Sequence, residues 1–530
     1  MSFVRNRQDQ ISFQNGEYLL TGREKAMLKN SWASFFAESV FPKIDEEPFA
    51  VLYSEKDSRP NTPVNVQVGA LILKELHGLS DDGVFTAMLF DLRFRIALHT
   101  EDFEEQPMSD RTLGRFRERC RKYEEKTGAD LIGNAVKTLS KEMAKLMRLD
   151  DSLKRMDSMM ISSNIKRMSR LELLYVTLAN AVKAIENEKG RIEADLEDYT
   201  DDSNRNVVIY HNRSEDTERK IDRILRDAQT LLEQCPESGL QAVELLKRVL
   251  DEQTVEEDGK LRLRTEEDGG MNSSMLQSPF DPDATCRTKH GEVWHGYSAN
   301  FVEAAGPEGS IVEDYDLQPN NYSDAQYLKD MISKMGDREE KATIVADGGY
   351  SGFDAKELAA EKGIEIVNTN LTGKEPDPFL ADFVFSEDGT AVRSCPNGCS
   401  PCSQTFSERT GQCTIHMVET DCRECPHFSM CHPFKTKTGY RKTVSRKSKL
   451  RAEWLKERSG ERFRQLSHVR NGVEAIPSLL RRKYRVDKMP VRGRLRCKMF
   501  LGFKIAALNF RRFCIFQQSR AKRAYELKKG

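Results

Sequence analysis

The chain has 530 residues, of which 32% are charged and 38% hydrophobic, and its mean hydropathy is −0.63. A chain of this length can bury several hydrophobic cores, so we expect more than one domain. The first residues lack the apolar run of a secretory signal, and the most apolar late stretch, 499–510, is interrupted by Lys504. That stretch is also too short to span a bilayer. The sequence therefore predicts a cytoplasmic protein without a membrane partner.

Charge is distributed unevenly along the chain. Residues 434–530 contain 30 Lys and Arg against 6 Asp and Glu, a net charge of +24, which leaves −25 for the rest of the chain. Aromatic side chains such as Trp454, Phe463 and Tyr484 are interleaved with these cations, unlike in a low-complexity tail. Lys and Arg that neutralise phosphates release condensed counterions. The basic region therefore predicts a nucleic-acid partner, in preference to a solvated tail.

Residues 1–150 are predicted to form a helical domain. Apolar residues recur at helical spacing over 66–80. Ser80 is placed to cap a second helix over 81–98, and Ser109 to cap a third that begins at residue 110.

The third of these predicted helices carries cations on one face. Arg111, Arg115 and Arg119 follow one another at intervals of four residues, and apolar side chains lie on the opposite face. Two interpretations remain open: a helix-turn-helix arrangement that contacts DNA, or an amphipathic helix with a solvated face.

The middle of the chain changes from helical to mixed sequence. Residues 170–279 are acidic and predicted to be mostly helical. Strands and helices then alternate, which predicts an α/β core with a parallel component. The predicted strands are 296–306, 310–318, 342–347 and 364–370, and the predicted helices are 324–336 and 354–363.

Two predicted strands each carry one acid among apolar residues. Asp157 lies in "RMDSMMISSN", and Asp347 ends "IVAD" directly before two glycines. Burial of a carboxylate without a counter-ion is costly, so a bound cation explains these acids better than packing does. Carboxylate oxygens are the ligands that Mg²⁺ and Mn²⁺ prefer, and two such ions can promote phosphodiester cleavage.

A third acid, Glu474, lies in a segment predicted to be helical. Arg470 precedes it by four residues and Arg481 follows it by seven, so all three side chains are predicted to face one way.

Seven of the twelve cysteines lie between residues 395 and 431. Cys422, Cys425 and Cys431 have the spacing C-x2-C-x5-C, and Cys395, Cys399 or Cys402 can supply a further thiol. In a cytosolic protein this spacing predicts zinc in preference to a disulfide, although His427 and His432 can compete as ligands.

Several motifs together resemble the DDE transposases of bacterial insertion sequences, whose catalytic domain is RNase H-like. They are "DSMMISSN" at Asp157, "SPFDPDATCRTKHGEVWHGYSANFVEAAG", "VADGGYSG" at Asp347, "RNGVE" with "RRKYRVDKMPVRGRLRCKMFLGFKIAALNFRR" around Glu474, and the N-terminal helical sequence that ends "SDRTLGRFRERC". The resemblance implies that Asp157, Asp347 and Glu474 are the metal-binding catalytic triad, with Mg²⁺ or Mn²⁺ as cofactor.

The resemblance also implies the domain layout. A helical DNA-binding domain, 1–150, precedes an RNase H-like mixed sheet flanked by helices within 151–530. The acids are 190 and 127 residues apart, so insertions must separate the core strands, and 170–279 and 380–435 are the predicted ones. The basic segment 436–530 is predicted to be largely helical. Similar cysteine-rich insertions in the resembled group favour Cys395, Cys422, Cys425 and Cys431 as ligands of a structural zinc.

The third acid departs from the family pattern, Tyr-x-x-Arg-x-x-x-Glu-x6-Lys. Ser467 replaces the Tyr, which leaves open any strand handling such as hairpin formation, and Arg481 replaces the Lys but can still hold a phosphate. Pro477 does not fit a helix interior unless it kinks the helix or begins a new one. Glu457 and Glu461 are alternatives to Glu474.

The function implied by the resemblance is transposition. Activated water cleaves the phosphodiester at each transposon end, and the freed 3′-hydroxyl then attacks target DNA. Arg470, Arg481 and the Lys and Arg of 435–530, with Arg111, Arg115 and Arg119, are expected to bind the terminal repeats and the target. A homodimer should bridge the two ends, in a bacterial, nucleoid-associated setting. The alternatives are a nuclease of the same fold and an inactive, domesticated transposase that only binds DNA.

Overall fold

The structure is a computed structural model of the chain. It describes residues 1–6, 20–56, 58–100, 108–190, 196–210, 214–235, 239–289, 291–335, 341–369, 375–458 and 460–529. The chain divides into two compact units. Unit 1 comprises Met1–Asp150, Asp157–Tyr322 and Ala475–Gly530, and unit 2 comprises Asp151–Met156 and Ser323–Glu474. Among the described residues, no helix has the length and apolar composition that a bilayer crossing requires.

Helices form the N-terminal part of unit 1, as predicted. They are α1 (Gly22–Lys29), α2 (Trp32–Ser39), α3 (Val64–His77), α4 (Asp81–Phe90), α5 (Leu92–Ala97), α6 (Thr112–Thr127) and α7 (Leu131–Leu146). Ser80 caps α4 as predicted, because its hydroxyl accepts a hydrogen bond from the Gly83 N–H.

Two local predictions in this region are wrong. The single helix predicted over 81–98 is divided, because Asp91 has an extended backbone and its side chain caps α5 instead. Ser109 does not cap α6, which begins only at Thr112; the Ser109 hydroxyl contacts the Thr112 hydroxyl at 2.9 Å in the preceding turn.

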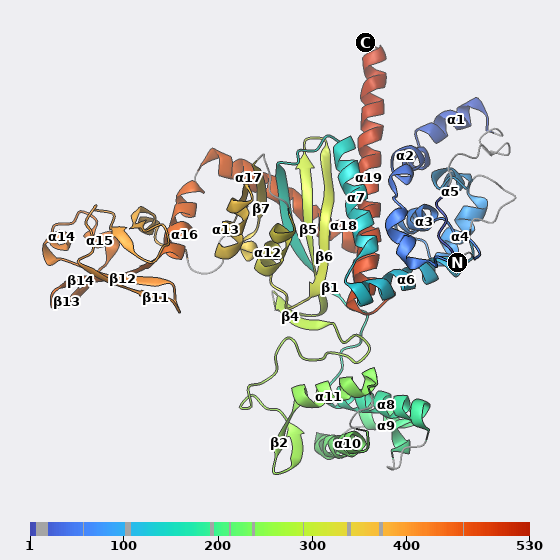
Figure 1. The fold of residues 1–530 in the computed structure, drawn as a ribbon, viewed down its shortest axis with the longest axis horizontal. Coiled ribbons are helices and arrows are strands. Elements are labelled where there is room, and N and C mark those ends of the chain that lie inside the picture. Colours follow the sequence, from blue (N-terminus) through green and yellow to red (C-terminus); the bar gives the residue numbers. More distant parts are fainter. Residues whose placement is uncertain are drawn as a thin grey trace. The chain divides into compact units, whose positions relative to one another are not determined.

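Two long antiparallel strands and one long helix form the centre of unit 1. The strands are β5 (Glu292–Gly306) and β6 (Gly309–Pro319), with the shorter β4 (Thr285–Lys289) on the other side of β5. Helix α19 (Arg494–Lys529) lies against β6 beside α7, and it also contacts α3 and α6 (Figure 1). The apolar stretch 499–510 is thus the buried centre of α19, which explains its composition.

One buried amide joins α19 to the free edge of the sheet. Among the described strands β6 pairs only with β5, so its other edge has open hydrogen-bonding groups. The side chain of Asn509, fully buried, accepts from the Val312 N–H at 2.9 Å and donates to the Val312 carbonyl at 2.7 Å. It also donates to the Ser140 hydroxyl of α7 at 2.9 Å. The side chain of Asn509 therefore links α19 to β6 and α7.

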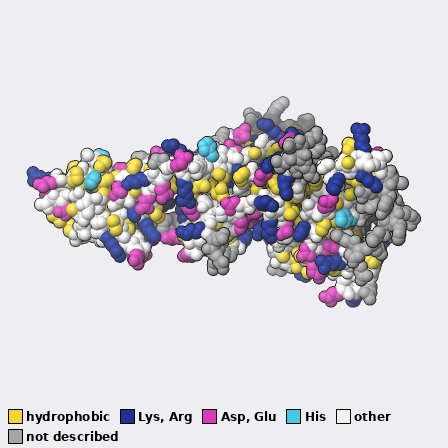
Figure 2. Space-filling model, turned by 90° about the horizontal axis from the view of Figure 1, so that it is seen from above, with side chains coloured by type: hydrophobic (Ala, Val, Ile, Leu, Met, Phe, Trp, Pro, Cys, Tyr) yellow, Lys and Arg dark blue, Asp and Glu magenta, His cyan; other side chains and the backbone are white. Residues whose placement is uncertain are grey.

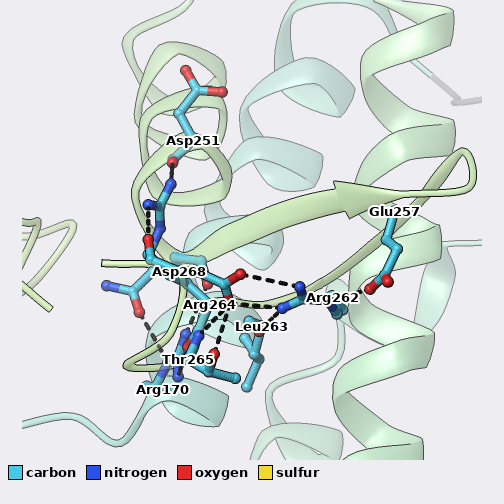
Figure 3. A network of polar contacts seen from close by, with 9 residues as sticks. Arg170, Asp251, Glu257, Arg262, Leu263, Arg264, Thr265 and Asp268 are labelled. Carbon is cyan, nitrogen blue, oxygen red and sulfur yellow. Dashed lines mark hydrogen bonds and ion pairs between the residues drawn. The ribbon is translucent and has the colours of Figure 1, made fainter. Parts of the chain in front are cut away.

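The acidic segment predicted as an insertion packs around its own hydrophobic cluster, which extends from Leu171 to Leu276. Its elements are α8 (Arg170–Lys189), α9 (Asp202–Tyr210), α10 (Ser214–Gln234), α11 (Gln241–Gln253), β2 (Thr254–Glu257) and β3 (Lys260–Leu263). A polar network joins its two ends (Figure 3): Arg170 donates to the carbonyls of Gln253 and Arg264, and Asp268 pairs with Arg262 at 2.7 Å.

Strand β1 (Leu153–Ser162) begins in unit 2 and ends in unit 1. Its first residues pair in parallel with β7 (Ala342–Ala346), and β7 pairs in parallel with β8 (Ile364–Asn368). The strand order is β4-β5-β1-β7-β8, with β6 beside β5. Helices α12 (Asp324–Lys334) and α13 (Phe353–Glu361) accompany β7 and β8. The predicted strands and helices of this core are confirmed, although Gly336 and Asn370, at the ends of two predicted elements, lie outside the described residues.

The cysteine-rich part of unit 2 contains a four-stranded antiparallel sheet, with the short pair β9 (Val384–Phe385) and β10 (Val392–Ser394) nearby in sequence. The sheet consists of β11 (Ser403–Ser407), β12 (Gln412–Met417), β13 (Phe434–Thr436) and β14 (Gly439–Ser445), and is accompanied by α14 (Glu419–Arg423) and α15 (Phe428–Cys431). The basic segment 436–530, predicted to be largely helical, begins with strand structure: β13 ends at Thr436 and β14 covers Gly439–Ser445. Buried Tyr440 and Val444 alternate with exposed Arg441 and Thr443, which is the two-residue period of a strand.

The fold class predicted from the sequence is confirmed as a mixed α/β sheet flanked by helices, with a helical N-terminal region and a cysteine-rich region. The chain after β14 is helical, as α16 (Arg446–Glu457), α17 (Glu461–Asn471) and α18 (Ala475–Arg482).

We predict that Asn509→Leu strongly destabilises the protein. The substitution leaves the buried N–H and C=O of Val312 without their side-chain partner, and each unsatisfied buried group costs roughly 1–3 kcal/mol. The midpoint of thermal unfolding, followed by circular dichroism, should fall by several degrees. Asn134→Leu, at an exposed position of α7, is the matched control and should leave the midpoint within about a degree. Equal midpoints for the two variants would contradict this role of Asn509.

Candidate active site

Asp347 lies where β7 ends and the chain turns. Its carboxylate accepts a hydrogen bond from the Gly349 N–H at 2.9 Å, so it caps the short 3₁₀ turn Gly348–Tyr350. The buried side chain of Asn368, at the end of β8, donates to the Asp347 carbonyl at 2.9 Å. The strand, the turn and the neighbouring strand therefore fix both the backbone and the side chain of Asp347.

The glycine at position 349 lies close to two carboxylates. A Cβ atom added to Gly349 would lie 3.1 Å from Oδ1 of Asp347 and 3.0 Å from Oδ2 of Asp324. Any larger residue would therefore need one or both acids to shift by a few tenths of an ångström. The expectation that a glycine keeps side-chain bulk away from Asp347 has a direct geometric basis at this position.

Arg470 joins Asp347 to Glu474. Its guanidinium lies 2.7 Å from Oε1 of Glu474 and 3.9 Å from Oδ2 of Asp347. The Arg470 side chain is only 14% exposed, whereas those of Asp347 and Glu474 are 33% and 63% exposed. One cation thus already lies between two acids that remain open to solvent.

The helix predicted around Glu474 is interrupted. Helix α17 ends at Asn471, a 3₁₀ turn covers Gly472–Glu474, and α18 begins at Ala475. Pro477 therefore falls in the first turn of a new helix, where its missing N–H costs little. This is one of the two placements that the sequence allowed for it.

The interruption also disproves the prediction that Arg470, Glu474 and Arg481 share one helix face. Arg481 belongs to unit 1, where its guanidinium binds Asp487 at 3.1 Å and the Met160 carbonyl at 2.8 Å. A four- or seven-residue spacing predicts a shared face only while the helix is continuous.

Arg155 positions the segment that carries Arg470, and sequence reasoning missed it. Its guanidinium donates to the Val469 carbonyl at 2.7 Å, and it is only 8% exposed. A Cβ added to Gly472 would collide with this guanidinium, so Gly472 is needed for the close approach. The available signal was an arginine inside an apolar strand, two residues before Asp157, which is as unusual as the acid itself.

Asp157 lies on β1 and is the first residue of unit 1 along that strand. It is 9% exposed, and its Oδ1 accepts a hydrogen bond from the Ser158 N–H at 2.9 Å. The structure thus groups Asp347, Arg470 and Glu474 within unit 2, while Asp157 and Arg481 belong to unit 1.

The arginines of the N-terminal helical region are accessible. Arg111 and Arg115 are exposed, and the guanidinium of Arg119 lies 5.3 Å from the centre of the Tyr53 ring. Arg111 precedes α6 rather than belonging to it, so the three residues are not on one helix. In Figure 2, Lys and Arg side chains are interspersed with Asp and Glu over the visible face, so no block of one sign dominates it.

The four preferred cysteines line a single small cavity in unit 2. It is bordered by Cys395, Cys422, Cys425 and Cys431, together with apolar side chains such as Phe379. Burial, followed by the influence of the other three thiols, raises the pKa of Cys422 to about 11.

None of the twelve cysteines forms a disulfide. Within the described parts of the chain, no three His, Cys, Asp or Glu side chains converge closely enough to enclose a metal ion. The four thiols therefore share a cavity without forming a closed ligand set.

Comparisons with known proteins identify two regions of the chain. A family model described as "Transposase domain (DUF772)" matches residues 27–119, the segment that contains Arg111, Arg115 and Arg119. A second, "Transposase DDE domain", matches residues 394–514, the segment that contains the cysteine cluster, Arg470 and Glu474.

No curated protein matches the chain. One similar solved structure is the piggyBac transposase synaptic complex with hairpin DNA, determined by cryo-EM. It has 8% sequence identity and a TM-score of 0.29, with 94% of this chain and 76% of that chain covered.

The two family matches lie in separate parts of the chain, and both describe transposase domains. The order of these parts, with a helical N-terminal region before the DDE segment, is the one that the sequence motifs predict. Together, the two matches support an insertion-sequence DDE transposase.

Proposed function

We propose that Asp157, Asp347 and Glu474 together bind the divalent ions, Mg²⁺ or Mn²⁺, that this transposase uses to cleave transposon ends and join them to target DNA. The observation that carries the proposal is the position of Arg470, which holds Asp347 and Glu474 on either side of one positive charge. Two solvent-accessible carboxylates against one guanidinium leave a net negative charge, which favours a bound cation.

The register of the parallel strands supports the inclusion of Asp157. Arg155 of β1 pairs with Val345 of β7. Asp157 follows Arg155 by two residues in β1, and Asp347 follows Val345 by two residues, directly after the end of β7. This equal offset in sequence from the last paired residues is the basis for including Asp157.

The residues fit a divalent ion by their chemistry. Asp347 and Glu474 offer hard carboxylate oxygens, and Gly349 leaves the space beside Asp347 open. Divalent ions bound there would activate a water or a 3′-hydroxyl and stabilise the leaving oxygen of the phosphodiester.

The chain's own residues orient the reacting groups. Asn368 and the Gly349 N–H fix Asp347, and Arg470 orients Glu474 from a largely buried position. Arg470 can also donate to a phosphate oxygen. Arg481 is 38% exposed, so its guanidinium can exchange Asp487 for a phosphate.

The DNA partners follow from this chemistry. We propose that the terminal inverted repeats and target duplex bind the N-terminal helical domain, 1–150, and basic residues of 436–530. Because both ends must be cut together, the active complex should be a homodimer. The segments 170–279 and 380–435 would be insertions in the catalytic domain, each with its own hydrophobic cluster.

We predict that Asp347→Asn and Glu474→Gln abolish cleavage and joining while leaving the fold intact. Loss of one electrostatic group at a reacting centre typically lowers the rate by about 10²–10³-fold. The assay supplies labelled element ends, plasmid target and Mg²⁺, and quantifies both cleaved ends and joined product. Cleavage without any joined product, even by the wild-type protein, would indicate a nuclease instead.

Two controls sharpen this test. Asp354→Asn removes a 79% exposed carboxylate from nearby helix α13 and should leave the rate unchanged. Glu461→Gln tests the alternative third acid. An active Glu474→Gln variant together with an inactive Glu461→Gln variant would show that Glu461, not Glu474, is the third metal-binding acid. An active Asp347→Asn variant would refute the proposed mechanism.

We also propose that Cys395, Cys422, Cys425 and Cys431 hold a structural zinc ion. Four thiols around one cavity match the ligand number and chemistry that Zn²⁺ prefers. Bound zinc would draw these thiolates together and so support the surrounding sheet, β11 to β14.

The zinc proposal predicts one zinc per chain in protein purified without chelators, measured by atomic emission. Cys422→Ser and Cys431→Ser should each lose the metal and lower the unfolding midpoint. Cys402→Ser, which changes an exposed thiol of the same block, should retain it. Zinc retained in Cys422→Ser, or absent from Cys402→Ser, would contradict this ligand set.

A further inference from the structure

A cavity of about 700 Å³ lies within unit 1, away from the residues discussed so far. One wall is the turn between α3 and α4, with Arg117 of α6 beside it. The other wall is the connection between α18 and α19, together with Phe500 and Lys504 of α19. The cavity is therefore built from both ends of the chain.

The floor of this cavity is a chain of paired charges. Lys504 lies 2.6 Å from Glu75, Glu75 lies 3.3 Å from Lys74, and Lys74 lies 3.4 Å from Asp81, which also pairs with Arg117. The side chains of Lys74, Lys504 and Glu75 are 10% exposed or less. These floor cations are neutralised by partners that cannot move away easily, and so they are not available to a ligand.

The rim differs from the floor because its cations are uncommitted. Lys483, Arg485 and Lys488 line the cavity with exposed side chains. Among the described residues, none of the three forms an ion pair, and the Lys483 ammonium lies 5.3 Å from the centre of the Tyr484 ring. Three exposed cations beside a floor of three cations and two acids give the cavity a local excess of positive charge.

The backbone of the rim is a further feature that accompanies functional sites. Arg485 has φ +49°, a left-handed conformation that is unfavourable for a side chain with a Cβ. Tyr484, only 3% exposed, also lines the cavity, although its hydroxyl is buried and so does not face the cavity.

We propose that Lys483, Arg485 and Lys488 bind the sugar-phosphate backbone of duplex DNA at this cavity. The proposal rests on the transposase function, and it selects three of the many basic residues in 436–530 as phosphate-binding groups. Exposed cations hold a single small anion weakly. A DNA backbone gains affinity at the same cations because each neutralised phosphate releases counterions.

The test is the salt dependence of DNA binding by the full chain in which all three rim residues are changed to Ala. Without divalent ions, the slope of log K against log salt should become shallower by about 0.9 for each phosphate that the variant no longer neutralises. The decrease in affinity should be equal for an element end and an unrelated duplex, because binding to phosphates carries no sequence information. A decrease confined to element ends would overturn the proposal in favour of base recognition.

A matched variant controls for net charge. Lys183→Ala, Arg219→Ala and Arg223→Ala combined remove three cations whose side chains are 38%, 83% and 57% exposed and lie elsewhere in unit 1. This variant should keep the wild-type slope. Equal slopes for the rim and control variants would overturn the proposal, as would a rim variant that changes self-association of the chain but not DNA binding.

Arg485→Gly provides a second test with a single substitution, so it does not require the fold to tolerate three substitutions at once. Glycine accepts the left-handed backbone without strain, so the unfolding midpoint should stay level or rise while DNA affinity falls. Ethylation of single phosphates identifies the bound positions directly. At least one ethylated phosphate should weaken binding of the wild-type protein but not of the rim variant, and the absence of any such position would refute backbone binding.

The DNA-binding test of the cavity proposal can fail independently of the cleavage test of the catalytic proposal. Asp347→Asn should bind DNA with the wild-type slope but not cleave it, whereas the rim variant should cleave normally once DNA is saturating at low salt. A wild-type slope in the rim variant would refute the cavity proposal alone, and cleavage by Asp347→Asn would refute the triad alone.

Discussion

The fold of unit 1 depends on the way Asn509 completes the free edge of β6. An edge strand offers unpaired backbone groups, and a buried one must have them satisfied. Asn509 supplies a donor and an acceptor on one planar amide, so it serves Val312 much as a neighbouring strand would. A side chain on a helix can do this only if the helix lies close against the sheet. The pairing therefore fixes the position of α19, and with it the helices that α19 contacts.

The same helix explains why a strongly basic sequence need not present all its charge to DNA. Lys498 lies 2.8 Å from Asp130, Lys504 pairs with Glu75, and Arg512 lies 2.6 Å from the fully buried Glu303. These cations link α19 to the N-terminal helices and to β5. Removal of one partner from such a buried pair is destabilising, because the remaining charge stays desolvated. The net charge of a segment thus overstates the charge that a polyanion can reach.

Local periodicity predicted the element types well, and the single acids among apolar residues remain a prediction for the candidate site. The errors arose where a few residues overrode a pattern. Asp91 divided a predicted helix by capping, and α17 ends next to Gly472, whose backbone Arg155 approaches closely. Such approaches join residues more than 300 positions apart, and no local pattern reports them. For the same reason Arg155 and Asn368, which position the candidate site, could not be found from spacing.

The hydrogen bonds of Asn509 have a consequence for how copies of such a gene decay. Asn509 and Arg512 lie close to the end of the sequence, far from the acids proposed for catalysis. A stop codon between Glu474 and Asn509 would leave Asp157, Asp347 and Glu474 in the translated protein but remove the partner of Val312. Truncated copies would therefore lose their folded state before they lost any residue of the chemistry, and intact motifs in a genome are a poor guide to which copies still produce a working enzyme.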